Sequence, residues 1–279
     1  MSLRRTAARV LVLVVVLLAM LVAGCSSRAG AARTELTVTG STTILPIAEV
    51  AAEMFHEQHT DLRVLVAGVG SSAGIESVTK GTSDIGTSSR DLKPEEKSLG
   101  LVDTPIAFDA IAVIVNPSNP VRALTTKQAA DIFEGKITNW KDVGGSDQLI
   151  WLVNRDEASG TREAFSKIVL GGAPFDPKSA VLPGTGQVRS VVADSATSVG
   201  YISLGFVDKS VKAVSIDGIQ PTEKTVADGT YPVSRVLHFF TKGKPSGLAK
   251  QYVDFVLSSA VQSKVVRDAG FLPVAEGRK

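Results

Sequence analysis

The segment GSSAG, at residues 70–74, places Ser72 in the pattern G-x-S-x-G that presents the nucleophile of many serine hydrolases. The same segment also fits a turn before a helix, where hydroxyl and N–H groups hold an anion. A serine nucleophile needs a general base, and His238 is the only histidine that follows Ser72 in the chain. Because His238 lies in the apolar run RVLHFF, we expect it to pack in the core. The anion site is therefore the stronger interpretation, and a hydrolase with Ser72 as its nucleophile is the weaker alternative.

Similar turns follow two other predicted strands. GSTTILP follows the strand-like LTVTG, and NRDEASGT follows LIWLV. Ser72 and Ser159 stand where residues that cap helix N-termini are common. Helix N-termini at the carboxyl ends of parallel strands offer unpaired N–H groups and a partial positive charge. Three such turns, with Arg155 as a bidentate clamp, predict a shared oxyanion site, and SDIGTSSRD adds a fourth polar turn.

The elements that would position these turns alternate along the chain. Strands are expected at residues 36–40, 62–70, 83–89, 110–117, 149–155, 199–204, 211–216 and 231–243, and helices at 46–59, 73–81, 126–136, 160–172 and 248–270. The Gly- and Pro-rich stretch 171–187 is expected to be a surface excursion. This alternation predicts an α/β fold with mostly parallel sheets, divided into two lobes.

The N-terminus has the features of a bacterial targeting segment. Basic residues precede an apolar run over residues 10–23, whose helical length of about 21 Å falls short of the hydrocarbon core of a bilayer. The run ends in VAGC, so we expect a lipoprotein signal peptide at residues 1–24 and a lipid on Cys25, with ordinary secretory cleavage as the alternative. Residues 25–35 are expected to be a flexible tether. The product would be lipid-anchored to the outer face of the bacterial cell membrane, on its periplasmic or extracellular side.

The net charge argues against nucleic acid as a partner. The 279-residue chain has 30 Lys and Arg and 28 Asp and Glu, and Arg4, Arg5 and Arg9 belong to the expected signal peptide. This leaves 27 basic against 28 acidic residues after residue 24, without the basic excess that phosphate backbones require. The chain lacks a Walker A loop, a dinucleotide fingerprint and a Cys/His cluster, and acids such as Asp109 are expected to be structural. We therefore expect no cofactor, no metal and no enzymatic activity.

The order of the motifs resembles a known family. The matching segments are GSTTILPIAE, GVGSSAGIESVTKGTSDIGTSSRDL, PIAFDAIAVIVNP, DIFEGKITNW, RDEASGTREAF, VGYISLGFV and YPVSRVLHFFTKG. Together they resemble the phosphate-binding proteins of bacterial ABC transporters, in their shorter lipoprotein type. The resemblance implies a type II periplasmic-binding-protein fold, with two lobes, a ligand cleft and two crossing strands. Lobe I would comprise residues 36–107 and 230–279, and lobe II residues 108–229, with crossings near 106–110 and 228–232.

The resemblance also implies a function and a set of ligand residues. The chain would be a monomer that captures inorganic phosphate and delivers it to the permease subunits of an ABC transporter; the alternatives are another oxyanion, or a sensor or adhesin role. Arg155 would be the only cationic group of the site. Two departures are Ala158, where the family has glycine, and Ser89, where longer relatives have the aspartate that accepts a hydrogen bond from protonated phosphate. The implied phosphate-binding residues are Thr42, Thr43, Ser71, Ser89, Arg155, Ser159, Gly160 and Thr161.

Overall fold

The computed structural model describes residues 34–276. The expected signal peptide, Cys25 and the tether up to residue 33 lie outside this range. Glu35, which we expected to end the tether, is instead the first residue of a strand. Within residues 34–276, no helix is long and apolar enough to cross a membrane.

Strands and helices alternate over the first two thirds of the described chain. The strands are β1 (Glu35–Gly40), β2 (Arg63–Gly68), β3 (Ile85–Ser88), β4 (Leu101–Val115), β5 (Ala123–Leu124), β6 (Trp151–Arg155), β7 (Ala180–Leu182), β8 (Ser198–Ser203), β9 (Lys212–Ala213), β10 (Ser215–Ile216), β11 (Ser234–Lys242) and β12 (Leu272–Pro273). The helices are α2 (Leu45–Gln58), α3 (Ser71–Lys80), α4 (Thr126–Phe133), α5 (Gly160–Val169), α6 (Thr185–Asp194), α7 (Glu223–Ala227) and α8 (Gly247–Val256). Short 3-10 helices span Pro94–Leu99, Trp140–Val143, Leu204–Phe206 and Val274–Glu276, and a π-helix spans Val261–Val266.

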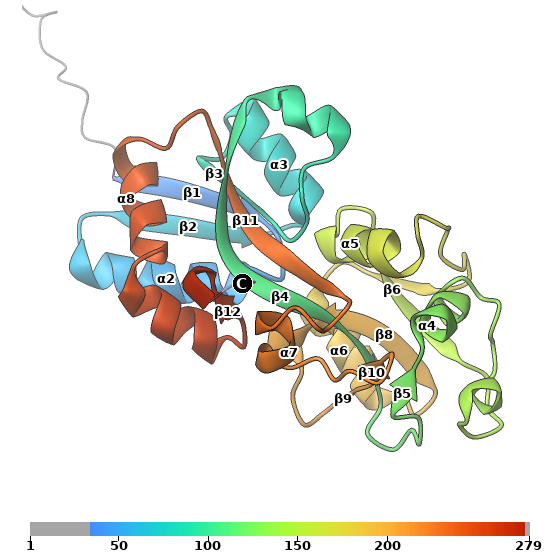
Figure 1. The fold of residues 1–279 in the computed structure, drawn as a ribbon. Coiled ribbons are helices and arrows are strands. Elements are labelled where there is room, and N and C mark those ends of the chain that lie inside the picture. Colours follow the sequence, from blue (N-terminus) through green and yellow to red (C-terminus); the bar gives the residue numbers. More distant parts are fainter. Residues whose placement is uncertain (1–33, 277–279) are drawn as a thin grey trace, which may run out of the picture. The chain divides into compact units, whose positions relative to one another are not determined.

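One long strand connects the two halves of the main sheet, whose order is β2-β1-β3-β11-β4-β8-β6-β7. β1 is parallel to β2 and β3, and β6 is parallel to β7 and β8, whereas β11 and β4 are antiparallel to their neighbours. Figure 1 shows β4 and β11 running side by side between these parallel groups. The expected parallel arrangement is thus correct for the strands that precede the hydroxyl-rich turns.

The β4–β11 pair contains an irregularity that the C-terminal segment caps. Leu237 faces Ala107 but His238 faces Pro105, so Ile106 is an extra residue of β4. The side-chain amide of Gln262 donates to the carbonyl of Ile106 at 3.1 Å. The C-terminal segment therefore satisfies a carbonyl that the bulge removes from the ladder.

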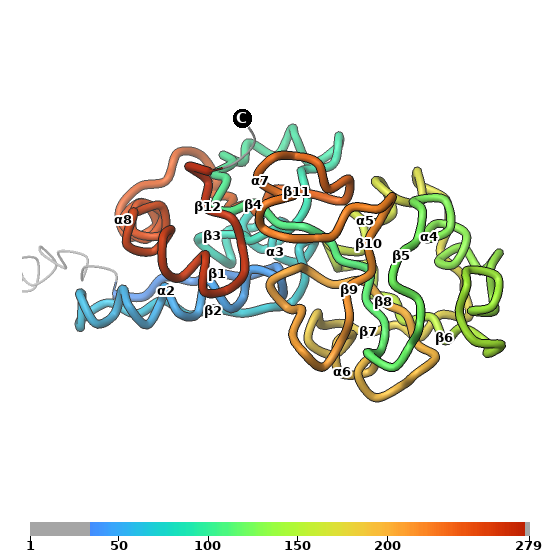
Figure 2. Tube along the Cα trace, turned by 60° about the horizontal axis from the view of Figure 1, so that its bottom comes forward, coloured from blue at the N-terminus to red at the C-terminus, as the bar shows by residue number. Residues whose placement is uncertain are grey.

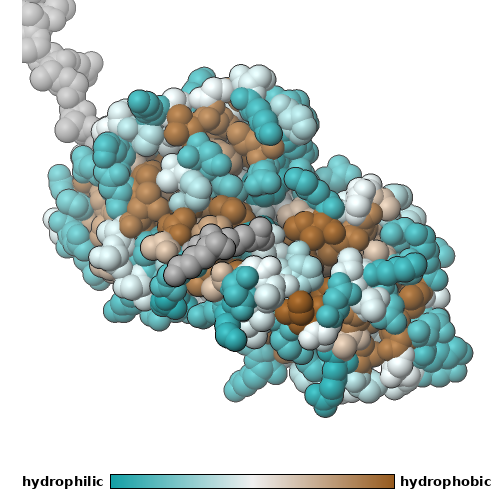
Figure 3. All heavy atoms as spheres, in the orientation of Figure 1, coloured by the Kyte–Doolittle hydropathy of each residue, from teal (hydrophilic) through white to brown (hydrophobic). Residues whose placement is uncertain are grey.

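Hydrophobic side chains form separate clusters on the two sides of β4. One joins β1, α2 and α8 with the π-helix, and its members include Leu36, Phe55 and Tyr252. Tyr252 of α8 donates its hydroxyl to the carbonyl of Ala48 of α2 at 2.8 Å, and Figure 2 shows these helices as neighbours. The other large cluster lies around β6, β8 and α5 and includes Phe165 and Tyr201, whose rings stack at 4.3 Å. On the face drawn in Figure 3, hydrophobic residues gather in patches that hydrophilic residues surround.

The sequence expectations were wrong in several places. β4 begins at Leu101, well before the expected strand at 110–117. Its first part was not predicted as a strand because it carries acids and Pro105 and lacks an apolar pattern. The stretch 171–187, expected to be an excursion, contains β7 and the first residues of α6, a helix that was not expected. The expected C-terminal helix at 248–270 is divided into α8 and the π-helix. The lobe boundaries stay a prediction.

Candidate anion-binding site

The hydroxyl-rich turns come together in the structure. α3 begins at Ser71, α5 at Gly160 and α6 at Thr185, each directly after a strand or a short turn, and α2 begins just after Thr43. All the expected ligand residues are buried except Thr42, which is half-buried. The convergence that the turns predicted is therefore present, and α6 adds a fourth helix N-terminus.

Ser71, Ser89 and Gly160 form one part of the cluster. Ser71 Oγ accepts a hydrogen bond from the backbone N–H of Ser89 at 3.1 Å and lies 3.3 Å from Ser89 Oγ. A methyl group on Gly160 would lie 2.3 Å from Ser71 Oγ and 2.9 Å from Ser89 Oγ. Only glycine therefore fits at position 160 in this arrangement, because the start of α5 touches the start of α3.

Two pairs of threonines form the other part. Thr43 Oγ1 lies 3.2 Å from Thr161 Oγ1, and Thr42 Oγ1 lies 3.1 Å from Thr185 Oγ1. In each pair one threonine follows β1 and the other belongs to a helix of the opposite half of the sheet. The hydroxyls of the two halves are thus in direct contact.

Arg155 lies at the end of β6 and is buried, with 1% of its surface exposed. Its Nη2 donates to Thr42 Oγ1 at 3.2 Å and its Nη1 to Thr185 Oγ1 at 3.1 Å. Its Nε donates to the carbonyl of Leu182 at 3.1 Å. Burial lowers the pKa of Arg155, and no ion pair among the described residues includes it. Arg155 therefore places a positive charge beside the threonine hydroxyls without a carboxylate that neutralises it.

The two expected helix caps have different outcomes. Ser159 caps α5 as predicted, and its Oγ accepts from the N–H of Arg162 at 3.2 Å. Ser72 is not a cap, because α3 begins one residue earlier and Gly70, with φ of 99°, occupies the cap position. Ala158 avoids a positive φ, a backbone conformation that would be strained for a residue with a side chain. Its carbonyl accepts from the N–H of Ser72 at 3.1 Å.

In the part of the chain that the structure describes, no histidine or carboxylate forms a hydrogen bond with the hydroxyl of Ser72. His238 is buried as expected, and its Nδ1 lies 2.8 Å from Asp103 Oδ1. The hydroxyl of Ser72 instead accepts from Arg90 Nη2 at 3.3 Å. The arrangement of these side chains does not support the hydrolase alternative. Within residues 34–276, no three His, Cys, Asp or Glu side chains group so that they could hold a metal ion.

Sequence analysis missed two residues of this cluster, Thr185 and Arg235. Thr185 opens α6 and contacts Arg155, and Arg235 of β11 donates to Thr43 Oγ1 and Thr161 Oγ1 at 3.3 and 2.9 Å. A second guanidinium therefore lies beside the hydroxyl cluster, in addition to that of Arg155. Arg235 was missed because it lies within an apolar strand, where a lone arginine gives no motif. The PGTG turn before α6 is the signal that could have indicated Thr185.

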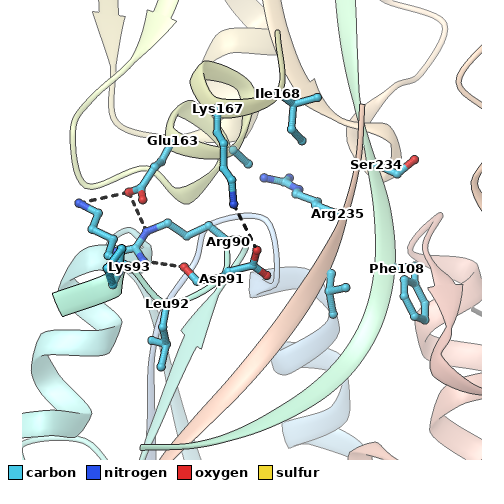
Figure 4. Close-up of a pocket in the computed structure, with 13 residues that line it drawn as sticks. Arg90, Asp91, Leu92, Lys93, Phe108, Glu163, Lys167, Ile168, Ser234 and Arg235 are labelled. Carbon is cyan, nitrogen blue, oxygen red and sulfur yellow. Dashed lines mark hydrogen bonds and ion pairs between the residues drawn. The ribbon is translucent and has the colours of Figure 1, made fainter. Parts of the chain in front are cut away.

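A cavity of about 510 Å³ lies beside the cluster, and Arg235 is among its lining residues. Figure 4 shows Arg235 extending from β11 toward α5, and shows Glu163 of α5 facing Arg90 and Lys93. Glu163 Oε2 lies 2.9 Å from Arg90 Nε and 3.3 Å from Lys93 Nζ. Lys167 of the same helix lies 3.8 Å from Asp91. These ion pairs link α5 to the segment after β3, next to the hydroxyl cluster.

Comparisons with known proteins identify the family of the chain. The PBP superfamily domain matches residues 26–260. The phosphate-binding protein PstS of Bacillus subtilis (strain 168) is 38% identical over 247 residues, which cover 86% of this chain and 81% of that protein. PstS of Borreliella burgdorferi is 31% identical over 251 residues, which cover 86% of this chain and 90% of that protein.

Solved structures show the same fold. A substrate-binding protein from Clostridium perfringens, solved with bound phosphate, superposes with a TM-score of 0.82 at 40% identity, covering 86% of this chain and 99% of that one. An ABC-type phosphate transport receptor from Vibrio cholerae has a TM-score of 0.73 at 36% identity, covering 85% and 99%. The fold is therefore that of the periplasmic-binding proteins, as the resemblance implied. The chain belongs to the PBP superfamily and, within it, to the family of the PstS phosphate-binding proteins.

Proposed function

We propose that this protein captures inorganic phosphate outside the cytoplasm and delivers it to an ABC transporter. The observation that carries the proposal is the convergence of Thr42, Thr43, Ser71 and Thr161 with Arg155, which has no carboxylate partner. The names of the Bacillus and Borreliella relatives and the phosphate in the Clostridium structure support phosphate as the anion.

The chemistry of the cluster suits a small tetraoxo anion. A dianion loses its hydration on burial and needs many short hydrogen bonds in return. Hydroxyl groups, the N–H groups at the starts of α3, α5 and α6, and the Arg155 guanidinium supply such donors, and bonds to a charged group are worth about 1.5–3 kcal/mol each. The cap Ser159 fixes the start of α5, so that Gly160 and Thr161 face the anion. Ser89 is then the hydroxyl that accepts the proton of hydrogen phosphate in place of a carboxylate.

Calorimetric titration of the purified protein with phosphate tests the proposal. We expect a single tight site, and we expect sulfate, arsenate and molybdate to compete according to their fit. Because Ser89 stands where longer relatives have an aspartate, this site should exclude sulfate less strongly than a site with a carboxylate at that position. Absence of heat with phosphate, together with tight binding of another oxyanion, would favour the second candidate, a binding protein for that oxyanion.

The anchoring and the movement of the protein belong to the same proposal. Lobe I would comprise residues 36–107 and 230–279, and lobe II residues 108–229, with closure of the cleft read by the permease subunits. Lipid on Cys25 would hold a monomer at the outer face of the cell membrane. Replacing Cys25 by serine should release the protein from the membrane fraction, as measured by detergent-phase partition, and retention of the Cys25→Ser protein there would contradict the anchor.

A further inference from the structure

The second arginine of the cluster has no free hydrogen-bond donor. Arg235 donates from Nε and Nη2 to Asp109 Oδ2 at 2.9 and 2.7 Å. Its Nη1 donates to the carbonyl of Ser89 and to Thr161 Oγ1 at 3.1 and 2.9 Å, and its Nη2 also donates to Thr43 Oγ1 at 3.3 Å. A guanidinium has five N–H donors, and these contacts engage all of them. Arg235 therefore acts on a ligand through its neighbours and not by direct contact.

Asp109 holds Arg235 in place. The two residues face each other in the β4–β11 ladder, and both are buried. Asp109 also accepts from Ser203 Oγ at 2.8 Å. Burial raises the pKa of Asp109, and the adjacent Arg235 guanidinium opposes that rise. Ser203 holds the Asp109 side of the pair, and the contacts to Ser89 and the two threonines hold the Arg235 side. The paired charges cancel, so the uncompensated charge of the site stays with Arg155.

The contacts of Arg235 determine which way two hydroxyl groups point. A threonine hydroxyl has one proton to donate and accepts through its oxygen. Because the oxygens of Thr43 and Thr161 accept from Arg235, their protons must point away from the guanidinium. These two hydroxyls belong to opposite halves of the sheet and lie 3.2 Å apart, at hydrogen-bonding distance from each other. An anion that binds between the halves would take both protons and replace this contact.

We propose that Arg235, held by Asp109, is a positioning residue that makes Thr43 and Thr161 hydrogen-bond donors and so selects unprotonated oxygens on the anion. The inference rests on the proposed function and deepens it. On this side of the site a P–OH group would meet a donor, whereas an unprotonated oxygen accepts from both threonines. The protein should thus bind the phosphate dianion, with its single proton at Ser89, and discriminate against the monoanion, which carries a second proton.

The test compares the pH dependence of phosphate affinity in two proteins. The variant Arg235→Gln with Asp109→Asn removes both charges together, so that neither is left buried alone. In the unsubstituted protein, the calorimetric Kd for total phosphate should rise steeply as the pH falls below the second pKa of phosphoric acid. In the variant the affinity should fall about tenfold at high pH, and the dependence on pH should flatten because the hydroxyls are free to accept.

A second measurement separates positioning from mere support of the fold. In a Thr43→Val, Thr161→Val background the hydroxyls are absent, so adding the Arg235 and Asp109 substitutions should lower the affinity little further. An additive loss would overturn the inference. The control is Arg189→Gln with Asp208→Asn, which removes a partly exposed ion pair with 3.1 Å between Nη1 and Oδ2. This control should leave the affinity and its pH profile unchanged.

The outcomes also separate this inference from the proposed function. If the unsubstituted protein binds phosphate and the Arg235→Gln, Asp109→Asn protein keeps both its affinity and its steep pH profile, the positioning role is wrong and the phosphate site stands. If the unsubstituted protein does not bind phosphate, the proposed function itself is wrong.

Discussion

Replacing Gly160 by alanine tests directly whether the starts of α3 and α5 close around the anion. The added methyl group would lie 2.3 Å from Ser71 Oγ and 2.8 Å from Ser71 Cβ. Ordinary van der Waals contact begins near 3.4 Å, so Ser71 must move by about 1 Å or the two helix starts must separate. Ser71 is fully buried, which leaves it little space to move.

The expected loss of affinity can be estimated from the bonds that this movement breaks. If Ser71 Oγ turns away, the anion loses one donor, worth about 1.5–3 kcal/mol, so the Kd for phosphate should rise at least about tenfold. The N–H of Ser89 also loses its acceptor, at about 1–3 kcal/mol, and it does so with or without the anion. The ligand-free melting temperature should therefore fall as well.

Calorimetry gives the Kd, and thermal melting with and without phosphate gives the stability and its gain on binding. Gly186→Ala is the matched control, because Gly186 also lies in the first turn of a helix and a methyl group there meets nothing within 4 Å. Gly186→Ala should bind phosphate normally. A Gly160→Ala protein with the Kd of the unsubstituted protein would show that the two helix starts do not enclose the anion.

Three further substitutions have defined outcomes. Arg155→Ala should raise the Kd for phosphate at least about tenfold in calorimetry, because it removes the one guanidinium of the cluster that no carboxylate neutralises; an unchanged Kd would exclude Arg155 from the site. Ser72→Ala should bind phosphate normally, and a fluorophosphonate probe should not label the unsubstituted protein, since covalent labelling of Ser72 would support the hydrolase. Glu163→Gln should raise the Kd up to about fivefold at low salt, because it breaks the pair with Arg90 that links α5 to the segment after β3. Asp254→Asn, which breaks an exposed pair within α8, should have no effect on the same titration, and equal effects of the two substitutions would contradict the role of Glu163.

The turns of the site could be predicted because they are local. A strand followed by small hydroxyl residues and a helix is visible in a short window of sequence, and three such windows indicated the positions around Thr42, Ser71 and Ser159. The same windows carry the family's motifs, so the resemblance and the chemistry indicated the same residues. For residues that lie next to the start of their own helix, a short window of sequence was sufficient to predict the turn.

The remaining residues depend on contacts that are distant in sequence. Arg235 reaches the cluster because β11 pairs with β4 in a register that sets it opposite Asp109, and no local pattern specifies that register. β4 itself was only partly predicted, since Pro105 and the acids before residue 110 are unusual in a central strand. Thr185 was missed together with α6, a short helix whose start lies in a Gly- and Pro-rich stretch.

The carbonyl of Ile106, which the side chain of Gln262 caps, has a mechanical consequence. The bulge lies in the strand that both halves of the sheet share, and any bending of one half against the other passes through it. Gln262 also donates to the carbonyl of Val256 at 2.9 Å and accepts from the N–H of Val274 at 3.0 Å, so it braces the bulge against the end of the chain. We expect that this C-terminal side chain, which lies outside the hydroxyl cluster, stiffens the shared strand and so opposes movement of one half of the sheet against the other.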